Sequence, residues 1–233
     1  MNKLHVKTLL SDGIKILKQE DNNVKKLISP RFDQIVSLLE LYVKEIETFN
    51  AAYGLVGAQS TEELVIKHIL DSLGPLGIIS ALISDSPAGI VPARIADAGS
   101  GAGFPGIPLA ICLPEYKFTL IERMEKRTGF LWNVKAVLGL DNITIEEGEL
   151  EKTEKNRFSL ITFRAFKPLD KKLLKSLFAA CTPDGIIAAY KGKYEKTKQE
   201  IEPFKNLYKC EIIPCRIPFL NEERHLLVLK RFP

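Results

Sequence analysis

The chain has 233 residues, enough for one large domain or for a catalytic domain with a smaller appendage. Hydrophobic residues make up 45% and charged residues 27%, which excludes a disordered or fibrous chain. The net charge of +4 permits a polyanionic partner without demanding one. No run approaches the roughly 18 apolar residues of a membrane span, so we expect a cytoplasmic protein without a membrane partner. The four cysteines lack C-x-x-C spacing, which predicts neither a metal site nor a disulfide framework.

The N-terminal part is predicted to be entirely helical. Apolar residues recur there at spacings of three and four, and glycines are few. Pro30 lies where a helix can begin, and a further helix is predicted from about Thr61, with acidic residues in its first turn. A turn-forming cluster at 84–89 then ends this layer. We therefore divide the chain into an N-terminal helical extension, 1–88, and a second domain, 89–233.

In the second domain, short apolar runs alternate with helical patterns. Five of these runs fit buried strands, at 95–98, 118–121, 143–145, 159–163 and 186–189. The alternation predicts a parallel sheet with helices on both faces. Two further runs, at 211–213 and 226–229, have no helix-length pattern between them and predict an antiparallel hairpin that closes the sheet. The expected fold class is α/β, with a mixed, mostly parallel, Rossmann-like sheet.

A glycine-rich turn directly follows the first predicted strand. Gly99, Gly101 and Gly103 alternate with small residues, which lets the backbone turn sharply and approach a ligand closely. A strand before the turn and a helix after it would put the turn at the carboxyl edge of the sheet, where open α/β folds bind ligands. The pattern predicts a nucleoside-cofactor site, although a glycine turn that serves only strand-to-helix packing is an alternative.

Two cofactors compete for this site. Gly101, Gly103 and Gly106 also match the G-x-G-x-x-G fingerprint of dinucleotide folds. Asp97, just before the turn, would repel a pyrophosphate but suits a ligand that carries an ammonium and a sulfonium. Glu122, at the end of the next strand, can accept hydrogen bonds from the ribose hydroxyls of either cofactor. Asp97 therefore favours S-adenosylmethionine over a nicotinamide dinucleotide and predicts a methyltransferase.

The end of the fourth predicted strand narrows the methyl acceptor. The stretch 163–168 lacks the Asn/Asp-Pro-Pro-aromatic motif that clamps an exocyclic base amine, and no cysteine nucleophile follows it. A metal-binding cluster suited to a catechol-like substrate is also missing from the sequence. Guanine N7 fits, because its lone pair is an acceptor with no proton to remove. We therefore assign no catalytic base and no metal ligand.

Several motifs occur together in one order along the chain. They are 68–73, 97–110, Glu122 with Lys126 and Arg127, Arg164-Ala165 with 167–169, and Lys191-Gly192. In these motifs the chain resembles the bacterial small-subunit ribosomal RNA guanine-N7 methyltransferases, also called glucose-inhibited division protein B. The resemblance implies a class I methyltransferase fold with an N-terminal helical extension. It also implies methyl transfer to guanine N7 in the decoding region of 16S ribosomal RNA, within the 30S subunit or an assembly intermediate.

The same resemblance extends the set of cofactor residues. It implies that Gly99 and Phe104 line the cofactor site, that Leu150 and Glu151 flank the adenine, and that Arg164 lies beside the cofactor. The acidic stretch 147–151 can equally be a solvated turn on composition alone. In one departure, Glu149 stands where the family usually has an arginine, so no arginine role is carried over. The predicted cofactor residues are Asp97, Gly99, Gly101, Gly103, Phe104, Glu122, Leu150, Glu151 and Arg164.

Three cations are predicted to bind RNA. Lys126 and Arg127 follow the second strand, where cations can contact phosphates, although a solvated helix face explains them as well. The resemblance favours RNA contact. Lys167 lies near the end of the fourth strand, at the predicted functional edge of the sheet.

Other polar and aromatic residues have mainly structural interpretations. We expect His68 to be a packed or capping histidine rather than a base, and Trp132 to pack in the core rather than stack on a nucleobase. Asp71 and Ser72 are expected to tie the helical extension to the catalytic layer. Two other functions stay open, a small-molecule methyltransferase and a binding protein that holds the nucleoside without chemistry.

Overall fold

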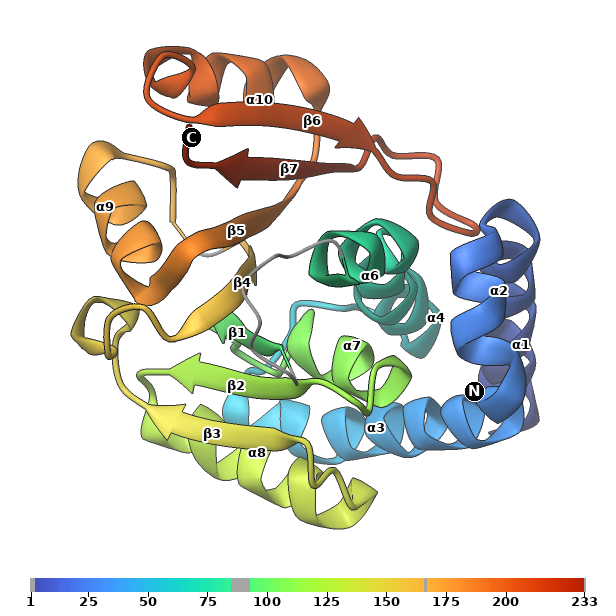
Figure 1. Ribbon diagram of the computed structural model, residues 1–233. Helices are drawn as coiled ribbons and strands as arrows, with labels where there is room; N and C mark the ends of the chain where they lie inside the picture. The colour runs from blue at the N-terminus through green and yellow to red at the C-terminus, as the bar shows by residue number, and fades with distance from the viewer. Residues whose placement is uncertain (1–2, 85–92, 166, 233) are drawn as a thin grey trace.

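The computed structural model describes residues 3–84, 93–165 and 167–232. Its centre is a seven-stranded sheet in the order β3-β2-β1-β4-β5-β7-β6 (Figure 1). The strands are β1 (Arg94–Ala98), β2 (Lys117–Glu122), β3 (Ile143–Glu147), β4 (Phe158–Arg164), β5 (Cys181–Lys191), β6 (Lys209–Pro214) and β7 (His225–Lys230). The first five are parallel, and β7 pairs antiparallel with both β5 and β6. The predicted mixed sheet with an antiparallel C-terminal hairpin is confirmed.

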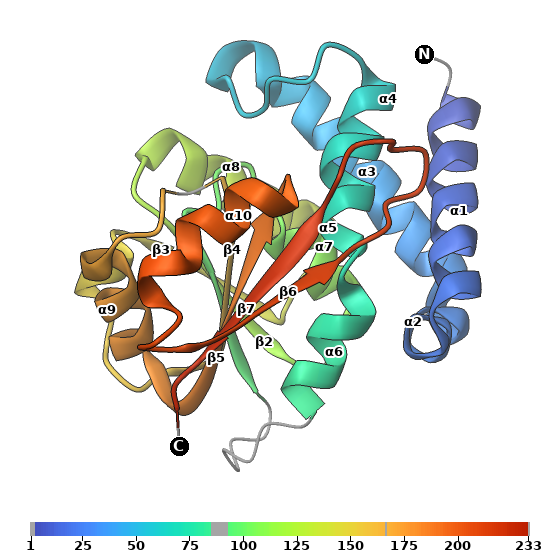
Figure 2. The same ribbon diagram turned by 90° about the horizontal axis from the view of Figure 1, so that it is seen from above.

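Helices cover both faces of the sheet. Neighbouring residues of a strand point to opposite faces, so one strand contributes apolar side chains to two separate cores. Ile95 and Leu160 belong to one hydrophobic core, whereas Ala96 and Ile161 belong to the other. The first core is shared with the N-terminal helices, α7 (Gly106–Cys112) and α8 (Glu125–Leu138). The second core is covered by α9 (Lys171–Ala180) and α10 (Tyr194–Ile201), on the other side of the strands (Figure 2). The sheet is therefore buried on both faces, as its continuous apolar runs predict.

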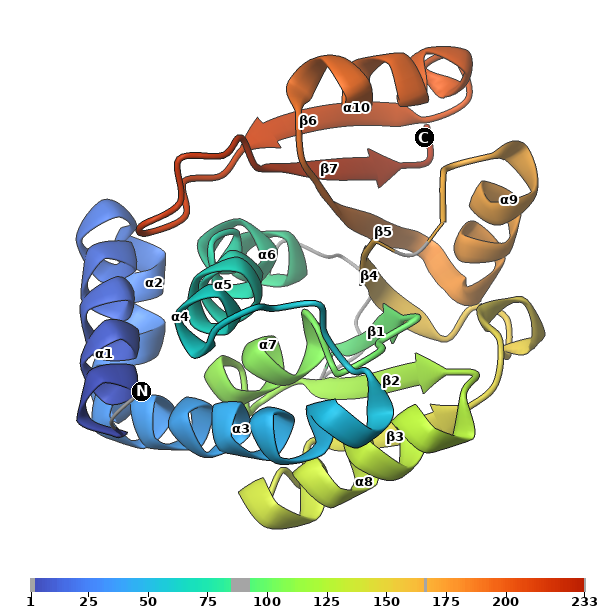
Figure 3. The ribbon, with the colours of Figure 1, turned by 180° about the vertical axis from the view of Figure 1, so that it is seen from behind.

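The N-terminal layer contains helices and no strands in the part that the structure describes, as predicted. Its helices are α1 (Lys3–Glu20), α2 (Asn22–Ile28), α3 (Phe32–Tyr53), α4 (Thr61–Leu64), α5 (Asp71–Leu73) and α6 (Leu76–Ser84). Asp21 caps α2, Ser60 caps α4, and Gly54 ends α3 in the left-handed conformation. Figure 3 shows α1 and α2 running across one end of α3, which itself packs on α7 and α8. The predicted domain junction at residues 88 and 89 lies outside the described residues.

One helical stretch, Thr61–Ser84, contains an irregular turn. Its segment Val65–Leu70 is π-helical and lies between α4 and α5. By length and composition alone, this stretch also passes the test for a membrane-spanning helix. Most of it is buried inside the protein, as in the core helix of a globular fold. The π-helical segment lies beside the carboxyl end of β4, where Arg164 donates to the Lys67 carbonyl.

The predicted core position of Trp132 is wrong. Its side chain is 51% exposed, whereas Phe130, Leu131 and Val134 on the same helix are buried. Neighbouring residues of a helix point about 100° apart, so adjacency to buried residues does not place a side chain on the buried face. The Lys135 ammonium lies 5.2 Å from the centroid of the Trp132 ring on this outward face.

Candidate active site

The glycine turn after β1 lies at the carboxyl edge of the sheet. Gly99, Gly101 and Gly103 have φ values of +69°, +58° and +100°, a region that side chains rarely adopt. The backbone N–H groups of Gly99 and Ser100 donate to the Ile121 carbonyl at 2.8 and 3.1 Å. These bonds fasten the turn to the end of β2. The turn therefore lies at the carboxyl edge of the sheet, as the sequence predicts.

Asp97 lies fully buried beneath this turn. Its Oδ2 accepts a hydrogen bond from the Gly106 N–H at 3.0 Å, and a Cβ on Gly106 would lie 2.7 Å from the same oxygen. Its Oδ1 is buried without a hydrogen-bond partner among the described residues. Burial raises the pKa of Asp97 to about 7. Asp97 thus offers one unpartnered acceptor to any donor that reaches it.

Glu122 is held in one orientation by the backbone around it. Its Oε2 accepts from the Gly101 N–H at 2.9 Å, and its Oε1 accepts from the Arg123 and Met124 N–H groups at 2.9 and 3.0 Å. The side chain is nearly buried, and Arg127 Nη1 lies 4.0 Å from Oε2. The carboxylate therefore joins the glycine turn to the end of β2, as expected.

A cavity of about 180 Å³ opens beside Glu122. Four of the predicted cofactor residues line it: Gly99, Glu122, Leu150 and Glu151. Apolar walls from Ile121, Met124 and Leu150 suit a nucleobase, and the Glu122 carboxylate suits ribose hydroxyls. The donor and acceptor set of this smaller cavity thus fits an adenosine group. Glu149, at the departure from the family pattern, lines the same cavity.

Two other predicted cofactor residues face the helical extension instead. A Cβ on Gly103 would lie 2.3 Å from Ile107 Cδ1 and 3.0 Å from the Tyr42 hydroxyl. Phe104 is 5% exposed, and its ring lies 5.4 Å from that of Tyr42 and 5.2 Å from that of His68. Gly103 and Phe104 therefore pack the turn against α3 and the π-helical segment.

The three predicted RNA-binding cations occupy different surroundings. Lys126 is exposed in the first turn of α8. Arg127, its neighbour, lines the smaller cavity beside Glu122. Lys167 pairs with Glu151 at 3.1 Å and borders both the smaller cavity and a larger one next to it.

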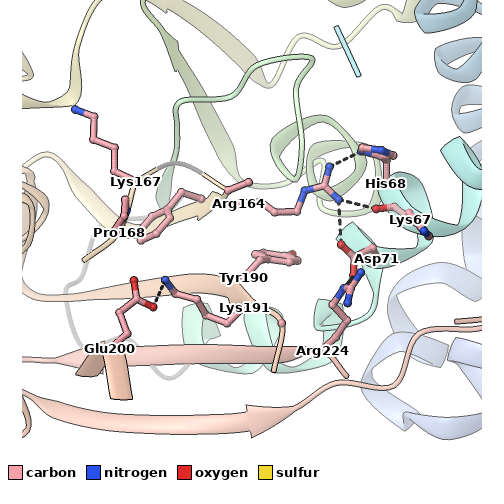
Figure 4. Close-up of a pocket in the computed structure, with 13 residues that line it drawn as sticks. Lys67, His68, Asp71, Arg164, Lys167, Pro168, Tyr190, Lys191, Glu200 and Arg224 are labelled. Atoms are coloured by element: carbon pink, nitrogen blue, oxygen red, sulfur yellow. Dashed lines mark hydrogen bonds and ion pairs between the residues drawn. The ribbon is translucent and has the colours of Figure 1, made fainter. Parts of the chain in front are cut away.

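The larger cavity measures about 660 Å³ and lies between β4, β5 and the π-helical segment (Figure 4). Ala165, at the end of β4, borders both cavities and has a φ of +49°. Such a conformation costs of order 1–3 kcal/mol outside glycine and is found at functional sites. The two cavities therefore adjoin where the backbone turns away from the sheet.

Arg164 is the best-connected side chain of the larger cavity. Its Nη1 donates to the Lys67 carbonyl at 2.9 Å and to Asp71 Oδ2 at 3.0 Å, and its Nη2 donates to His68 Nδ1 at 2.7 Å (Figure 4). Its guanidinium carbon lies 5.0 Å from the centroid of the Phe104 ring. His68 is thus a packed histidine, as predicted.

The predicted tie between the extension and the sheet is also confirmed. Asp71 is 5% exposed and binds Arg164 of β4, while the Ser72 carbonyl accepts from the Tyr190 hydroxyl of β5 at 2.7 Å. Each bond joins a helical residue to the end of a strand.

Sequence reasoning missed several residues of this larger cavity. Arg224, just before β7, donates from Nε to Asp71 Oδ1 at 2.9 Å, although 153 residues separate the two. Lys67 and Tyr190 also line the cavity. Lys191, from the motif Lys191-Gly192, lines it too and pairs with Glu200 at 2.7 Å. The charged residues around Arg224 are the only local signal in the sequence, and they do not indicate a partner on a helix.

The sheet order, the glycine turn after β1 and the acidic residue that ends β2 define the class I methyltransferase fold. Solved structures with this fold include a SAM-dependent methyltransferase from Aquifex aeolicus, with a TM-score of 0.53 and 17% identity, covering 69% of this chain and 92% of that one. A tRNA (m1A58) methyltransferase from the same organism has a TM-score of 0.54 and 10% identity, covering 69% of each chain. At these identities the likeness shows the fold alone.

The chain belongs to the rRNA small subunit methyltransferase G family, whose sequence model matches residues 35–227. A ribosomal RNA small subunit methyltransferase G from Treponema denticola is 39% identical, covering 99% of this chain and 98% of the relative. Relatives with the same description from Treponema pallidum and Cellvibrio japonicus are 40% and 35% identical, covering 84% and 87% of this chain, and 85% and 89% of their own lengths. Membership confirms the resemblance that the motifs indicate.

Proposed function

We propose that this protein transfers the methyl group of S-adenosylmethionine to N7 of a guanine in the decoding region of 16S ribosomal RNA. Beyond the family, one observation carries the proposal: two cavities of different chemistry adjoin at Ala165 and Lys167, on the carboxyl edge of the sheet. The smaller one suits a nucleoside. The larger one, with several lysines and arginines in its walls, suits a nucleotide of an RNA chain. The proposal implies a cytoplasmic enzyme that acts on the 30S subunit or an assembly intermediate.

The residues of the smaller cavity fit the cofactor. Glu122 would accept the ribose hydroxyls, and Met124 and Leu150 would hold the adenine between apolar surfaces. Beneath the adjoining glycine turn, Asp97 Oδ1 is a buried acceptor without a partner among the described residues. When bound, S-adenosylmethionine supplies a methyl group on a sulfonium, which a lone pair can take without a proton transfer. The glycine turn leaves room for close approach, because a Cβ on Gly101 would meet only the Gly99 carbonyl, at 4.0 Å.

The acceptor chemistry asks little of the protein beyond orientation. Guanine N7 carries a lone pair and no proton, so no side chain has to act as a base. His68, the obvious candidate base, already accepts a hydrogen bond at Nδ1, and burial lowers its pKa to about 4. Holding the two reactants in line is then the main contribution of the chain, and such orientation can supply several kcal/mol of the barrier, roughly 7–11 in the best cases.

Two measurements test this function. Calorimetry should detect binding of S-adenosylmethionine, and Gly101→Val should abolish it, because valine opposes the positive φ of that position. Incubation with labelled cofactor and 30S particles from cells that lack the enzyme should yield 7-methylguanine in 16S RNA, located by mapping the modified base. A different modified base would overturn the guanine-N7 assignment, and turnover of metabolites without RNA would favour a small-molecule enzyme. Binding without any turnover would favour a nucleoside-binding protein.

A further inference from the structure

The π-helical segment Val65–Leu70 alters the backbone pairing next to the larger cavity. The N–H of Asp71 donates to the carbonyls of Ile66 and His68, and not to that of Lys67, its partner in a regular α-helix. The Lys67 carbonyl accepts from Arg164 Nη1 instead. Single π-helical turns inside helices occur frequently at functional sites. Here the irregular turn supplies a backbone acceptor to a side chain of the sheet.

Two side chains complete the hold on Arg164. Asp71 Oδ2 takes the second Nη1 hydrogen, and His68 Nδ1 takes one from Nη2. An arginine has only donors, so His68 Nδ1 must be the acceptor, and the ring proton must lie on Nε2. With its pKa lowered to about 4 by burial, the imidazole is neutral at pH 7 and keeps this lone pair. Arg164 is thus fixed by three bonds and by contact with the Phe104 ring.

This arrangement leaves donors of Arg164 for a ligand. A guanidinium has five N–H groups, and the three bonds use both on Nη1 and one on Nη2. The Nε–H and the second Nη2–H have no acceptor among the described residues. Arg164 lines the larger cavity and is adjacent in sequence to Ala165, where the two cavities adjoin. A donor-only group therefore borders the space in which an acceptor base would meet the cofactor.

The purine edge next to N7 differs between the two purines. Guanine carries the acceptor O6 there, whereas adenine carries a donor amino group. N7 must keep its lone pair for the methyl group, so a donor on this edge is limited to O6. Methylation also leaves a positive charge on the purine, which a bare guanidinium would oppose. The Asp71 carboxylate, 3.0 Å from Arg164 Nη1, offsets that repulsion.

We propose that Arg164 selects guanine over adenine by donating to O6 of the acceptor base, and that Asp71, His68 and the Lys67 carbonyl hold it for this role. The inference rests on the proposed function, since it names a residue that reads the acceptor. Arg164 is a specificity residue in this scheme. Asp71 is a positioning residue that acts through Arg164.

The test is a double-mutant cycle, which removes O6 from the substrate and the guanidinium N–H donors of Arg164 from the protein. The substrates are 30S particles reconstituted with 16S RNA that carries guanine or 2-aminopurine at the mapped acceptor position. 2-Aminopurine keeps N7 and lacks O6. We expect kcat/KM of the wild type to fall by about 10–100-fold on this substitution, as for a lost base contact. In Arg164→Met, the ratio of kcat/KM for guanine to kcat/KM for 2-aminopurine should approach the ratio of the intrinsic reactivities of the two bases. That intrinsic ratio is the same for every variant.

Asp71→Asn tests the positioning role. It should lower the guanine to 2-aminopurine ratio, and it should have no further effect on that ratio when Arg164→Met is already present. A matched control is Arg157→Met, because Arg157 is a partly exposed arginine, paired with Glu146, next to the opposite end of β4. This control should keep the wild-type ratio. Thermal unfolding shows whether each variant folds, and binding of S-adenosylmethionine is measured separately. If Arg164→Met does not fold, Arg164→Lys, with a smaller set of donors, should keep part of the selectivity.

Three results would overturn the proposal. A wild-type ratio of guanine to 2-aminopurine methylation in folded Arg164→Met would show that Arg164 does not read O6. If Arg164→Met does not fold, a wild-type ratio in both of the single variants Arg164→Lys and Asp71→Asn would show the same. Weaker cofactor binding in Arg164→Met with an unchanged ratio would show that its donors serve the carboxylate of the cofactor. Failure of the wild type to form 7-methylguanine would remove the proposed function itself, and it would be visible before any variant is made.

Discussion

The two adjoining cavities are built in different ways. The smaller cavity is formed largely by the ends of β1, β2 and β3. Its Glu122 carboxylate accepts from the backbone N–H groups of Arg123 and Met124, its next residues in the chain, and of Gly101, 21 residues away on the neighbouring strand end. The larger cavity combines a helical residue, Asp71, with arginines that lie 93 and 153 residues away along the chain. A nucleoside site is thus encoded in local motifs, whereas the acceptor site depends on the extension docking on the sheet.

Burial shifts the pKa values of Asp97, beneath the glycine turn, and of His68, in the wall of the larger cavity, in opposite directions. Asp97 has a pKa raised to about 7, and His68 has a pKa lowered to about 4. Burial disfavours the charged form of both groups, which is the deprotonated acid but the protonated base. Folding stability should therefore respond to pH in opposite directions at the two sites.

The largest expected effects follow from these shifts. Between about pH 4 and 7 the folded state keeps a proton on Asp97 that the unfolded state releases, so this group lowers stability as the pH rises. Between about pH 4 and 6.5 the unfolded state binds a proton at His68 that the folded state does not bind. The free energy of unfolding therefore increases as the pH rises through this range. At about 1.4 kcal/mol per pKa unit, the effects are on the order of 4 and 3 kcal/mol.

Denaturant unfolding of Asp97→Asn and His68→Gln measures both effects against the wild type, without added cofactor because a ligand would change the stability itself. Relative to the wild type, Asp97→Asn should gain stability as the pH rises, and His68→Gln should lose it. Differences of the same sign for the two variants would contradict the opposite shifts.

The next effect concerns the cofactor alone. Glu122→Ala removes the acceptor of three backbone N–H groups and of the ribose hydroxyls, and each bond to a charged group contributes about 1.5–3 kcal/mol. We expect the affinity for S-adenosylmethionine to fall by about 100-fold or more in calorimetry. Glu149→Ala is the control, because Glu149 lines the same cavity, is half exposed and pairs with Lys152. Equal losses in the two variants would show that negative charge, and not the orientation of Glu122, determines binding.

The sequence predicts the smaller cavity better than the larger one for a physical reason. Gly101 follows β1 and Glu122 ends β2, its parallel neighbour, so the register of the sheet brings them together wherever those strands form. Nothing local connects Asp71 to Arg224, because their contact requires the π-helical turn and the position of β7 beside β5. From the sequence we expect Asp71 and Ser72 to tie the extension to the sheet, but the sequence does not predict their partners. Trp132 shows the complementary limit, since its apolar neighbours do not reveal which helix face is buried.

Lys126 and Arg127 give the smallest expected effects and the sharpest division between the two kinds of site. The sequence predicts that both of these adjacent residues bind RNA. In the structure, however, Lys126 is exposed, whereas Arg127 lies beside Glu122 in the smaller cavity. Lys126→Ala should therefore lower methylation of 30S particles by about 3–10-fold, reduce the slope of its salt dependence by about one phosphate contact, and leave cofactor affinity unchanged. Arg127→Ala should lower cofactor affinity as well.

Lys205→Ala is the matched control for this pair, since Lys205 is an exposed lysine paired with Glu202, next to Phe204 at the second core and outside both cavities' linings. It should change neither the rate nor the salt slope. If Lys126→Ala weakened cofactor binding as much as methylation, the first turn of α8 would belong to the nucleoside site as a whole. The boundary between the two cavities would then lie beyond that helix, and RNA contact would rest on the larger cavity and Lys167.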